Sequence, residues 1–471
     1  MLGNTILKST TALALCIGMA GVAYAEPTVV RVVIKDTSES NPLDAAHMTR
    51  IEAAMAAQGN EIDIQLIDLP AGGYADKLNL MLLSGDIPDL IYFQGGDEQI
   101  ANQDLLLDWQ PLLEGTAYLQ DALWPHNVAR LANYPYLLYP FAARTKAPLI
   151  RTDWLEQTGL GAPNTLDEWT ALLRAVSASD FDGDGVQNTY GIMAPGNTAE
   201  LDAVFNQAFG VTGSWIQNGG EWVDARVSDE ERAKLAYYHM LYADGLLDPE
   251  FITKNWEVKE DDLYAGRVGV VMGTAGVVVG IYQYKMQQVH PGAEMTLLLP
   301  PTGVAQGLQA TSVSKETRGF AVSALSENVD MVVELMDFLA SPDGQMMERM
   351  GFEGTHFTND GGAMALTDES GNWWPRFLVA QPSAWTPPID LLTPVAQASL
   401  DQGVQFFSAD NAFVFPSDMA VDVDAAENFY RTAVFRFISG EVSLDDWDEY
   451  VADFNDAGGD NLTAYARTVL N

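Results

Sequence analysis

The sequence predicts an α/β protein of about two domains, and three observations support this prediction. Short β-branched or alternating runs recur between segments with helical spacing, which is the pattern of packed helix and strand layers. The chain has 471 residues, whereas a single hydrophobic core stops growing at roughly 250–300 residues. Hydrophobic residues make up 48% of the chain, which is enough to bury a large core.

Residues 1–25 are predicted to be an export signal peptide. Lys8 precedes an apolar stretch at 11–20, and residues 23–25 (AYA) form a small-x-small cleavage pattern. Cys16 is the only cysteine, and the bulky Leu15 before it fits a lipid-attachment signal poorly. We therefore expect a periplasmic protein without a lipid anchor, and a mature chain that holds no disulfide.

Strands are expected near the N-terminus and again in the second half of the chain. Three apolar or alternating runs near the N-terminus cover residues 28–34, 62–66 and 90–93. Two later runs, at 268–272 and 295–299, are also predicted strands. If these later strands join the N-terminal sheet, the chain passes between its domains more than once.

Two amphipathic helices are well marked. Residues 163–176 carry an apolar face behind Thr165 and Glu168, which can form a capping box. Residues 329–340 carry a second apolar stripe, which ends at the turn-forming sequence SPDG at 341–344. Both stripes are expected to pack against a core.

The chain is strongly acidic, with 24 Lys and Arg against 65 Asp and Glu, for a formal net charge of −41. Such a surface repels nucleic acid and anionic membranes, so neither is an expected partner. The acidity is suited either to a cationic ligand or to a solvated surface in salty water. The acidic residues are spread along the whole chain, which favours the solvated surface.

Residues 180–191 (DFDGDGVQNTYG) match most of an EF-hand-type calcium loop. Calcium prefers six to eight oxygen ligands, and alternate residues of a tight loop point inward to supply them. The predicted ligands are the side chains of Asp180, Asp182, Asp184 and Asn188 and the carbonyl oxygen of Val186. Gly191 replaces the bidentate Glu of the full pattern, so we expect a structural calcium ion rather than a switch. An acidic turn without metal is the alternative.

Catalytic motifs are not evident. The five histidines form no HExxH pair, and neither a GxSxG elbow nor a GxxxxGK(S/T) phosphate loop occurs. A glycosidase needs two carboxylates with opposed roles, and a chain with 65 acidic residues always offers some pair. Nothing singles out such a pair, so we expect a protein that is not an enzyme.

Several segments, taken together in their order, resemble one family. They are 85–90 (GDIPDL), 151–155 (RTDWL), 163–169 (PNTLDEW), 263–269 (LYAGRVG), 338–345 (FLASPDGQ) and 351–357 (GFEGTHF). The chain resembles the extracellular solute-binding proteins of carbohydrate ABC importers, and among them the alginate- and oligosaccharide-binding proteins. The position of the calcium-type loop after the 163–176 helix is similar to that in the alginate binders, although Thr189 stands where those relatives often carry an acid.

The resemblance implies two α/β lobes of the periplasmic-binding-protein type, joined by a hinge of crossing strands. It also implies a monomer that binds ligand between the lobes and closes by hinge motion, and whose closed form meets the ABC permease. With it we expect residues 26–146 in lobe 1 and 147–274 in lobe 2. The chain is then expected to return to lobe 1 at 275–319 and to lobe 2, with C-terminal helices, at 320–471.

Candidate ligand contacts follow from the rule that binding residues lie at the carboxyl ends of strands. The rule nominates Asp36 and Ser38 after the first strand and Tyr92 and Gln94 after the third. Aromatic rings in Gly- or Pro-rich loops suit the apolar faces of sugars; these are Trp215, Trp373, Trp374 and Trp385. The resemblance adds Glu353 and His356. Core packing is the alternative role for each Trp.

The expected function is therefore capture of an oligosaccharide and its delivery to a membrane permease. The alternatives are a binding protein for a peptide or polyamine, a secreted polysaccharide-active enzyme and a structural surface protein. Arg144 and Lys146 would suit an anionic sugar, but the sequence leaves the identity and charge of the sugar open.

Overall fold

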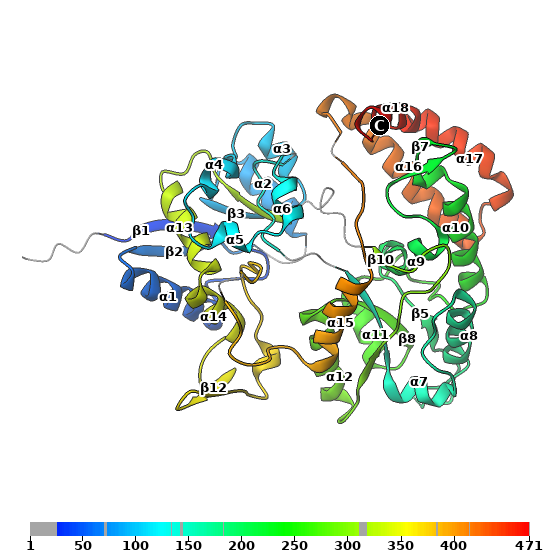
Figure 1. Ribbon diagram of the computed structural model, residues 1–471, viewed down its shortest axis with the longest axis horizontal. Coiled ribbons are helices and arrows are strands. Elements are labelled where there is room, and N and C mark those ends of the chain that lie inside the picture. The colour runs from blue at the N-terminus through cyan, green and yellow to red at the C-terminus, as the bar shows by residue number, and fades with distance from the viewer. Residues whose placement is uncertain are drawn as a thin grey trace, which may run out of the picture.

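The computed structural model describes residues 26–69, 73–132, 134–141, 145–181, 183–309, 318–382, 385–413 and 415–470. The predicted signal peptide and Cys16 lie outside these residues. The described residues form two α/β bodies, here called lobe 1 and lobe 2, each built on a four-stranded sheet. The lobes lie side by side along the longest axis of the molecule (Figure 1). The predicted two-lobed α/β fold is confirmed.

Lobe 1 has a sheet with strand order β11-β3-β1-β2, in which β11 runs antiparallel to three parallel strands. Helices α1, α2 and α13 pack against this sheet, so residues such as Val30, Val32, Ile91 and Phe93 are fully buried. Its strands are β1 (Thr28–Val33), β2 (Ile62–Leu66), β3 (Leu90–Gln94), β11 (Arg318–Val322) and the hairpin β12 (Phe357–Asp360) and β13 (Ala363–Leu366). Its helices are α1 (Pro42–Ala57), α2 (Tyr74–Leu83), α3 (Asp97–Ala101), α4 (Trp109–Leu113), α5 (Leu119–Ala122), α6 (Pro125–Arg130), α13 (Val329–Ala340) and α14 (Pro342–Met350).

Lobe 2 has a sheet with strand order β5-β8-β4-β9, in which β4 runs antiparallel to both of its neighbours. Its strands are β4 (Lys146–Arg151), β5 (Tyr190–Ile192), β6 (Trp215–Asn218), β7 (Glu221–Asp224), β8 (Val268–Thr274), β9 (Met295–Leu297), β10 (Leu308–Gln309) and β14 (Phe407–Ser408). Its helices are α7 (Thr152–Thr158), α8 (Leu166–Ser177), α9 (Ala199–Phe209), α10 (Asp229–Ala243), α11 (Trp256–Tyr264), α12 (Val277–Val289), α15 (Pro394–Gln405), α16 (Ala420–Ser439), α17 (Trp447–Phe454) and α18 (Asp460–Leu470).

The two amphipathic helices form where the sequence predicts them. Thr165 caps α8, and the capping box with Glu168 is present. Trp169, Leu172 and Leu173 on the apolar face of this helix are fully buried in lobe 2. The stripe at 329–340 is α13, whose buried face packs into lobe 1.

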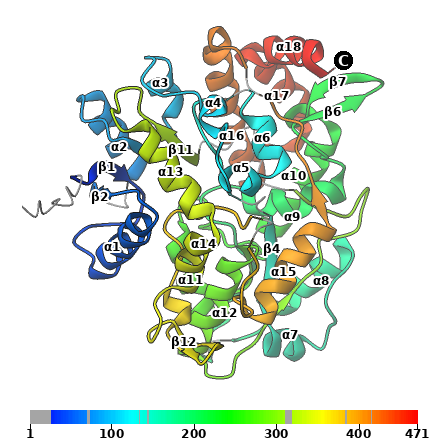
Figure 2. The same ribbon diagram turned by 60° about the vertical axis from the view of Figure 1, so that its left-hand side comes forward.

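The C-terminal helices α16, α17 and α18 enlarge lobe 2 at the end that also carries the β6–β7 hairpin (Figures 1 and 2). Helix α16 packs against α10, and Phe437, Trp447 and Phe454 continue the core of lobe 2. Within the described ranges, no helix is both long enough and apolar enough to cross a membrane.

Among the described residues, the core changes lobe three times along the chain. These changes fall between Phe141 and Ala147, between Leu308 and Phe320, and between Val379 and Val395. A further contact joins the lobes at Gly371, which lies against the ring of Tyr284 in α12.

The predicted points of return are therefore wrong. Residues 275–308 stay in lobe 2, because α12 packs on β8 and β9 pairs with β4. Residues 318–379 return to lobe 1, because β11 pairs with β3 and α13 packs on β1. The strand at 268–272 is correctly predicted, but its partner is β4 of lobe 2 rather than the N-terminal sheet.

Candidate functional site

One edge of each sheet faces the other lobe. The amino end of β1 lies on the side of lobe 1 away from lobe 2, so the carboxyl ends of its parallel strands point toward lobe 2 (Figure 1). In lobe 2, the start of β4 follows the first crossing, and Lys146 there pairs with Thr274 at the end of β8. Ligands of open α/β sheets bind outside such carboxyl ends. Polar groups on these two edges therefore form the candidate site.

Three of the predicted residues meet at the facing edge of lobe 1. Asp36 follows β1, is exposed and lies 3.3 Å from the Nζ atom of Lys35. Gln94 donates to the hydroxyl of Tyr92 at 3.2 Å, and Tyr74 donates to the carbonyl oxygen of Tyr92 at 2.6 Å. Burial, and then the nearby Tyr92 and Asp36, raise the pKa of Tyr74, so its hydroxyl remains a donor. This edge thus presents a carboxylate and an amide, whereas Tyr74 and Tyr92 are buried in the core of lobe 1 and support Gln94 from inside.

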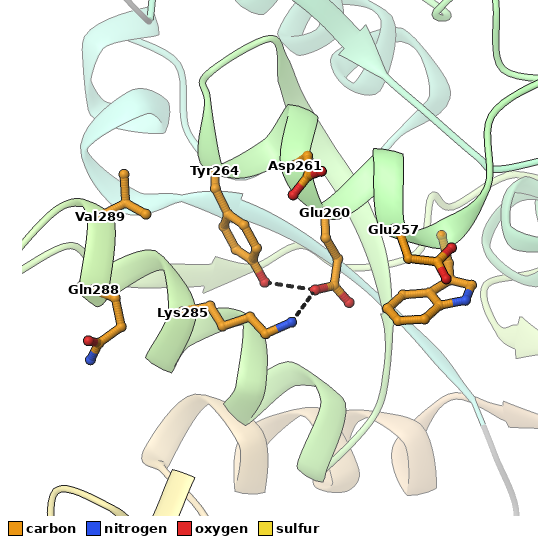
Figure 3. A pocket seen from close by; sticks show the side chains of 8 residues that line it. Glu257, Glu260, Asp261, Tyr264, Lys285, Gln288 and Val289 are labelled. Atoms are coloured by element: carbon orange, nitrogen blue, oxygen red, sulfur yellow. Dashed lines mark hydrogen bonds and ion pairs between the residues drawn. The ribbon is translucent and has the colours of Figure 1, made fainter. Parts of the chain in front are cut away.

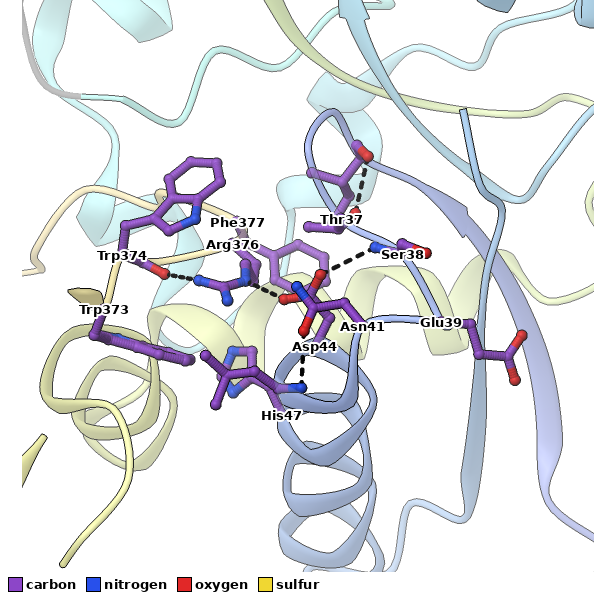
Figure 4. A network of polar contacts seen from close by, with 12 residues as sticks. Thr37, Ser38, Glu39, Asn41, Asp44, His47, Trp373, Trp374, Arg376 and Phe377 are labelled. Carbon is purple, nitrogen blue, oxygen red and sulfur yellow. Dashed lines mark hydrogen bonds and ion pairs between the residues drawn. The ribbon is translucent and has the colours of Figure 1, made fainter. Parts of the chain in front are cut away.

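A buried ion pair lies beside this edge and fixes Trp374 (Figure 4). Asp44 accepts hydrogen bonds from the backbone N–H of Ser38 at 3.0 Å and from Nε of Arg376 at 2.7 Å. The side chains of Arg376 and Asp44 are 3% and 1% exposed. Arg376 also donates to the carbonyl oxygen of Trp374, and its guanidinium lies 5.5 Å from the ring centroid of that half-buried Trp. The predicted Ser38 and Trp374 are therefore held by one network.

Trp373 and His356 are buried residues that pack beside this network. Trp373 is 6% exposed and donates from Nε1 to the carbonyl oxygen of Glu348 at 2.7 Å. His356 is 3% exposed, packs 5.1 Å from Trp373 between ring centroids, and accepts at Nδ1 from the N–H of Phe352. Burial and two neighbouring arginines lower the pKa of His356, which keeps the ring neutral. These two residues are placed to position Trp374 rather than to form the surface.

Glu353 and Trp385 lie apart from the network. Glu353 is exposed at the bend before the β12–β13 hairpin. Trp385 lies in the third crossing segment and is 7% exposed, although it belongs to neither lobe core.

The expectation that Trp215 is exposed in a loop is wrong. Trp215 begins β6, is 4% exposed and stacks on Phe413 in the core of lobe 2 with ring centroids 5.7 Å apart. The Gly pair that suggested a loop is the turn of the β6–β7 hairpin, where Gly219 and Gly220 both have positive φ angles. The residues before such a turn form a strand.

The facing edge of lobe 2 carries a cluster of two lysines and one carboxylate. Lys146 at the start of β4 and Lys259 of α11 both bond to Glu200 in the first turn of α9. The Nζ atom of Lys146 is 2.8 Å from Oε1, and the Nζ atom of Lys259 is 3.0 and 2.9 Å from Oε1 and Oε2. Lys259 also donates to the carbonyl oxygen of Met272 at 2.8 Å.

Burial lowers the pKa of Lys259; Glu200 opposes this shift and Lys146 adds to it. Sequence reasoning noted the charge of Lys146 but missed Glu200 and Lys259. No local pattern could have found them, because 59 residues separate Glu200 from Lys259.

The predicted calcium loop follows α8 in lobe 2. The carboxylate of Asp180 accepts from the N–H groups of Gly183 at 2.8 Å and Gly185 at 2.9 Å, and both glycines have positive φ angles. Asp184 accepts from the N–H of Val186 at 2.7 Å. Asp182 lies outside the described residues, and those that are described contain no group of three His, Cys, Asp or Glu side chains that could hold a metal.

The rest of the loop fits an oxygen cage in part. The Oδ1 atom of Asn188 is buried and has no hydrogen-bond partner among the described residues. Phe181 stacks on Trp154 with ring centroids 4.6 Å apart, which anchors the loop to lobe 2. Thr189 donates to the carbonyl oxygen of Gly266 at 3.1 Å, so its hydroxyl is used by the fold. An unsatisfied buried oxygen at the ninth position is what a bound cation would satisfy.

Two surface hollows of lobe 2 lie elsewhere. The larger, of about 420 Å³, lies between α11 and α12, where Tyr264 and Lys285 both bond to one oxygen of Glu260 (Figure 3). The smaller, of about 280 Å³, lies around Arg151 and His290. None of the predicted ligand contacts lines either hollow.

The two α/β lobes are joined by three crossings and present polar edges to each other. This arrangement defines a binding protein of the hinged, two-lobed class. The sequence profile of the family described as bacterial extracellular solute-binding protein matches residues 45–346. The chain belongs to this family, which confirms the resemblance inferred from its segments.

Individual relatives are distant. The chain is 26% identical to Lipoprotein LipO of Bacillus subtilis (strain 168) over 276 residues, a match that spans about half (54%) of each protein. It is 20% identical over 440 residues to the polygalacturonan/rhamnogalacturonan-binding protein YtcQ of the same strain, covering 85% of this chain and 84% of YtcQ. Among solved structures it is similar to an EF-hand mutant of the Streptococcus pneumoniae ABC-transporter substrate-binding protein FusA in complex with fructo-nystose. That match has a TM-score of 0.68 and 16% identity, and covers 94% of this chain and 98% of FusA.

Proposed function

We propose that this protein is the exported binding subunit of an ABC importer, which captures an oligosaccharide between lobe 1 and lobe 2 and hands it to the permease. The observation that carries the proposal is the pair of facing edges, one with Asp36, Tyr92 and Gln94 and the other with Lys146 and Glu200. Residues 1–25 direct export to the periplasm, and the mature chain acts as a monomer without catalysis.

The chemistry of the lobe 1 edge supports a sugar ligand. Sugars present apolar C–H faces and a rim of hydroxyl groups, which aromatic rings and polar side chains bind respectively. Trp374 offers a half-buried ring that Arg376 holds in place, and Asp36 and Gln94 offer acceptors and donors. The names of two relatives agree, since YtcQ binds polygalacturonan and FusA was solved with fructo-nystose.

Isothermal titration calorimetry of the mature protein against oligosaccharides, a peptide and a polyamine tests the proposal. We expect one saccharide class to bind, and Trp374→Ala to weaken that binding by roughly tenfold because it removes the stacking surface. Trp222→Phe, in the β6–β7 hairpin of lobe 2, is the matched control and should leave affinity unchanged. Binding of the peptide or polyamine alone, or turnover of a labelled polysaccharide, would refute the proposal.

We also propose that the loop at 180–191 holds a structural calcium ion. Asp180, Asp182, Asp184 and Asn188 would supply side-chain oxygens and Val186 its carbonyl oxygen. The buried, unpartnered Oδ1 of Asn188 supports this assignment, as does the spacing of the loop. Calcium would stabilise lobe 2 by cancelling the repulsion between the clustered carboxylates.

Thermal unfolding with and without calcium tests this second proposal. Calcium at about 100 times its dissociation constant should add about 2.7 kcal/mol of stability. Asp184→Asn should remove most of the gain, whereas Asp153→Asn, an exposed acid of α7 on the same lobe, should keep it. An unchanged melting temperature at millimolar calcium, together with no heat of binding, would exclude the site.

A further inference from the structure

Resting on the proposed function, we propose that Lys146 binds an anionic group of the ligand, so that the cargo is an oligosaccharide that carries carboxylates or sulfate esters. The inference comes from the imbalance of charge at the facing edge of lobe 2. Two lysines share one carboxylate there, and only one of the two can reach a ligand.

Lys259 is fully used by the protein. Its ammonium group has three donors, and the structure supplies three acceptors: both oxygens of Glu200 and the carbonyl oxygen of Met272. Its side chain is 2% exposed, so no ligand can reach it. This arrangement engages both oxygens of Glu200 and leaves the carboxylate less able to neutralise a second lysine.

Lys146 is the exposed member of the cluster. Its side chain is 28% exposed and contacts only Oε1 of Glu200, with no other hydrogen-bond or ion-pair partner in the described part of the chain. An ammonium group with one partner has two donors left for a ligand. The lysine lies just after the first crossing, at the edge that faces lobe 1.

A helix start also lies near Lys146. The 11-residue helix α9 begins at Ala199, beside Lys146 and Glu200, and Asn197 accepts from the N–H of Ala199 there. The helix dipole places partial positive charge at this end. In a chain of net charge −41, a cluster in which two lysines share one carboxylate is unusual. An anionic ligand group would balance it.

Two other charge clusters of lobe 2 show the opposite stoichiometry. Lys254 lies within 4 Å of Asp248, Asp262 and Glu250, and Arg226 pairs with Asp224 and Glu427. There the acids outnumber the bases, as the composition leads one to expect. Around Glu200 the bases outnumber the acid, and this cluster lies at the edge where the proposed ligand binds.

Binding of matched charged and uncharged sugars tests the inference. The probes are trigalacturonate and its methyl ester for carboxylates, and a sulfated carrageenan tetrasaccharide and its unsulfated counterpart for sulfate esters. Calorimetry should show at least about tenfold tighter binding for one charged member, the gain of a charge-assisted hydrogen bond. Which pair shows the preference identifies the anion.

Three variants assign the preference to Lys146. Lys146→Gln should abolish it while leaving the affinity for the uncharged member unchanged, and Lys146→Arg should restore it. Arg174→Gln is the control, because Arg174 of α8 is an exposed cation of lobe 2 that pairs with Asp244 at 2.6 Å. It should leave the preference intact.

The failures of the two proposals are distinguishable. If uncharged oligosaccharides bind at least as tightly as charged ones, or Lys146→Gln keeps the preference, the oligosaccharide function stands and the role of Lys146 is rejected. If no saccharide of either kind binds, the proposed function itself falls and the anionic subsite falls with it.

Discussion

Lobe 2 buries two lysines, and the protein compensates them in opposite ways. Lys234 of α10 is 2% exposed and lies 2.8 Å from Asp202 and 2.9 Å from Glu231, with Asn206 as a further acceptor. Lys259 is as deeply buried, but the carboxylate that it contacts, Glu200, is shared with a second lysine.

The titration behaviour of the two lysines follows from this difference. Burial lowers the pKa of both, because it removes water from the charged form. At Lys234 the two acids outweigh burial and the pKa is raised, whereas at Lys259 burial prevails and the pKa is lowered. The protein thus neutralises the positive charge of Lys234, which lies between helices. It leaves a surplus of positive charge at Lys259 and Lys146, on the edge of lobe 2 that faces lobe 1.

Removing Lys234 should have the largest effect. Lys234→Met leaves Glu231 and Asp202 close together without their cation, and an uncompensated buried charge costs about 3–5 kcal/mol. Urea unfolding should show a loss of about 4 kcal/mol at pH 7. The loss should shrink toward pH 4, where burial and Asp202 favour protonation of Glu231. A loss below about 1 kcal/mol would mean that the cluster is not compensated as described.

Asp97 extends the comparison to lobe 1, because burial of this carboxylate outweighs the opposing charge of Arg130. Asp97 is 1% exposed, its Oδ1 has no hydrogen-bond partner, and burial raises its pKa to about 6 from an ordinary value of 3.8. A raised folded-state pKa means that the folded protein holds this proton more tightly than the unfolded chain. Stability from this group is therefore present below about pH 4 and is lost as the pH rises to about 6.

Asp97→Asn should remove that loss. The variant should be more stable than the wild type by up to about 3 kcal/mol at pH 8, and the advantage should vanish near pH 4. Urea unfolding at both pH values measures this difference. Asp360→Asn, an exposed acid of the β12 hairpin, should show no such dependence. An advantage of equal size at both pH values would attribute the effect to packing rather than to ionisation.

Lys259→Met sharpens the comparison between the two buried lysines. Glu200 keeps Lys146 as its partner, so the variant loses mainly the hydrogen bond to Met272 and part of the neutralisation of Glu200. We expect a loss of about 2 kcal/mol, smaller than for Lys234→Met. Lys259→Met could instead destabilise the protein more than Lys234→Met in the same urea titration. In that case the number of partner charges does not determine how much each buried lysine contributes to the free energy of unfolding.

Much of the fold could be predicted from local patterns. β-branched runs and the Thr165–Glu168 capping box indicated strands and helices, because these features act within a few residues of the chain. The lobe that each late segment joins could not be predicted. The pairing of β8 with β4 and of β11 with β3 depends on tertiary packing between distant segments, to which a hydrophobic strand is equally suited in either sheet.

The candidate site, like the fold, could be predicted only in part. Ser38 and Gln94 follow from the position of strand ends, whereas Tyr92, nominated by the same rule, lies within β3 and is buried in the core of lobe 1. The ion pair that fixes Trp374 joins Asp44 to Arg376 across 332 residues, and no local pattern announces it. At Trp215 a local pattern was misleading. The glycines that suggested an exposed loop form the turn of a hairpin, and Trp215 lies in the buried strand before that turn.

A surface ion pair should give the smallest effect and so set the baseline for the others. Arg436 and Glu441 lie 2.8 Å apart with side chains 47% and 60% exposed. Water screens this pair, so Glu441→Gln should change the free energy of unfolding by less than about 0.5 kcal/mol. A loss comparable to that of Lys259→Met would show that the short distance, rather than burial and partner number, determines what these charges contribute. The contrast between the two buried lysines would then have no energetic basis.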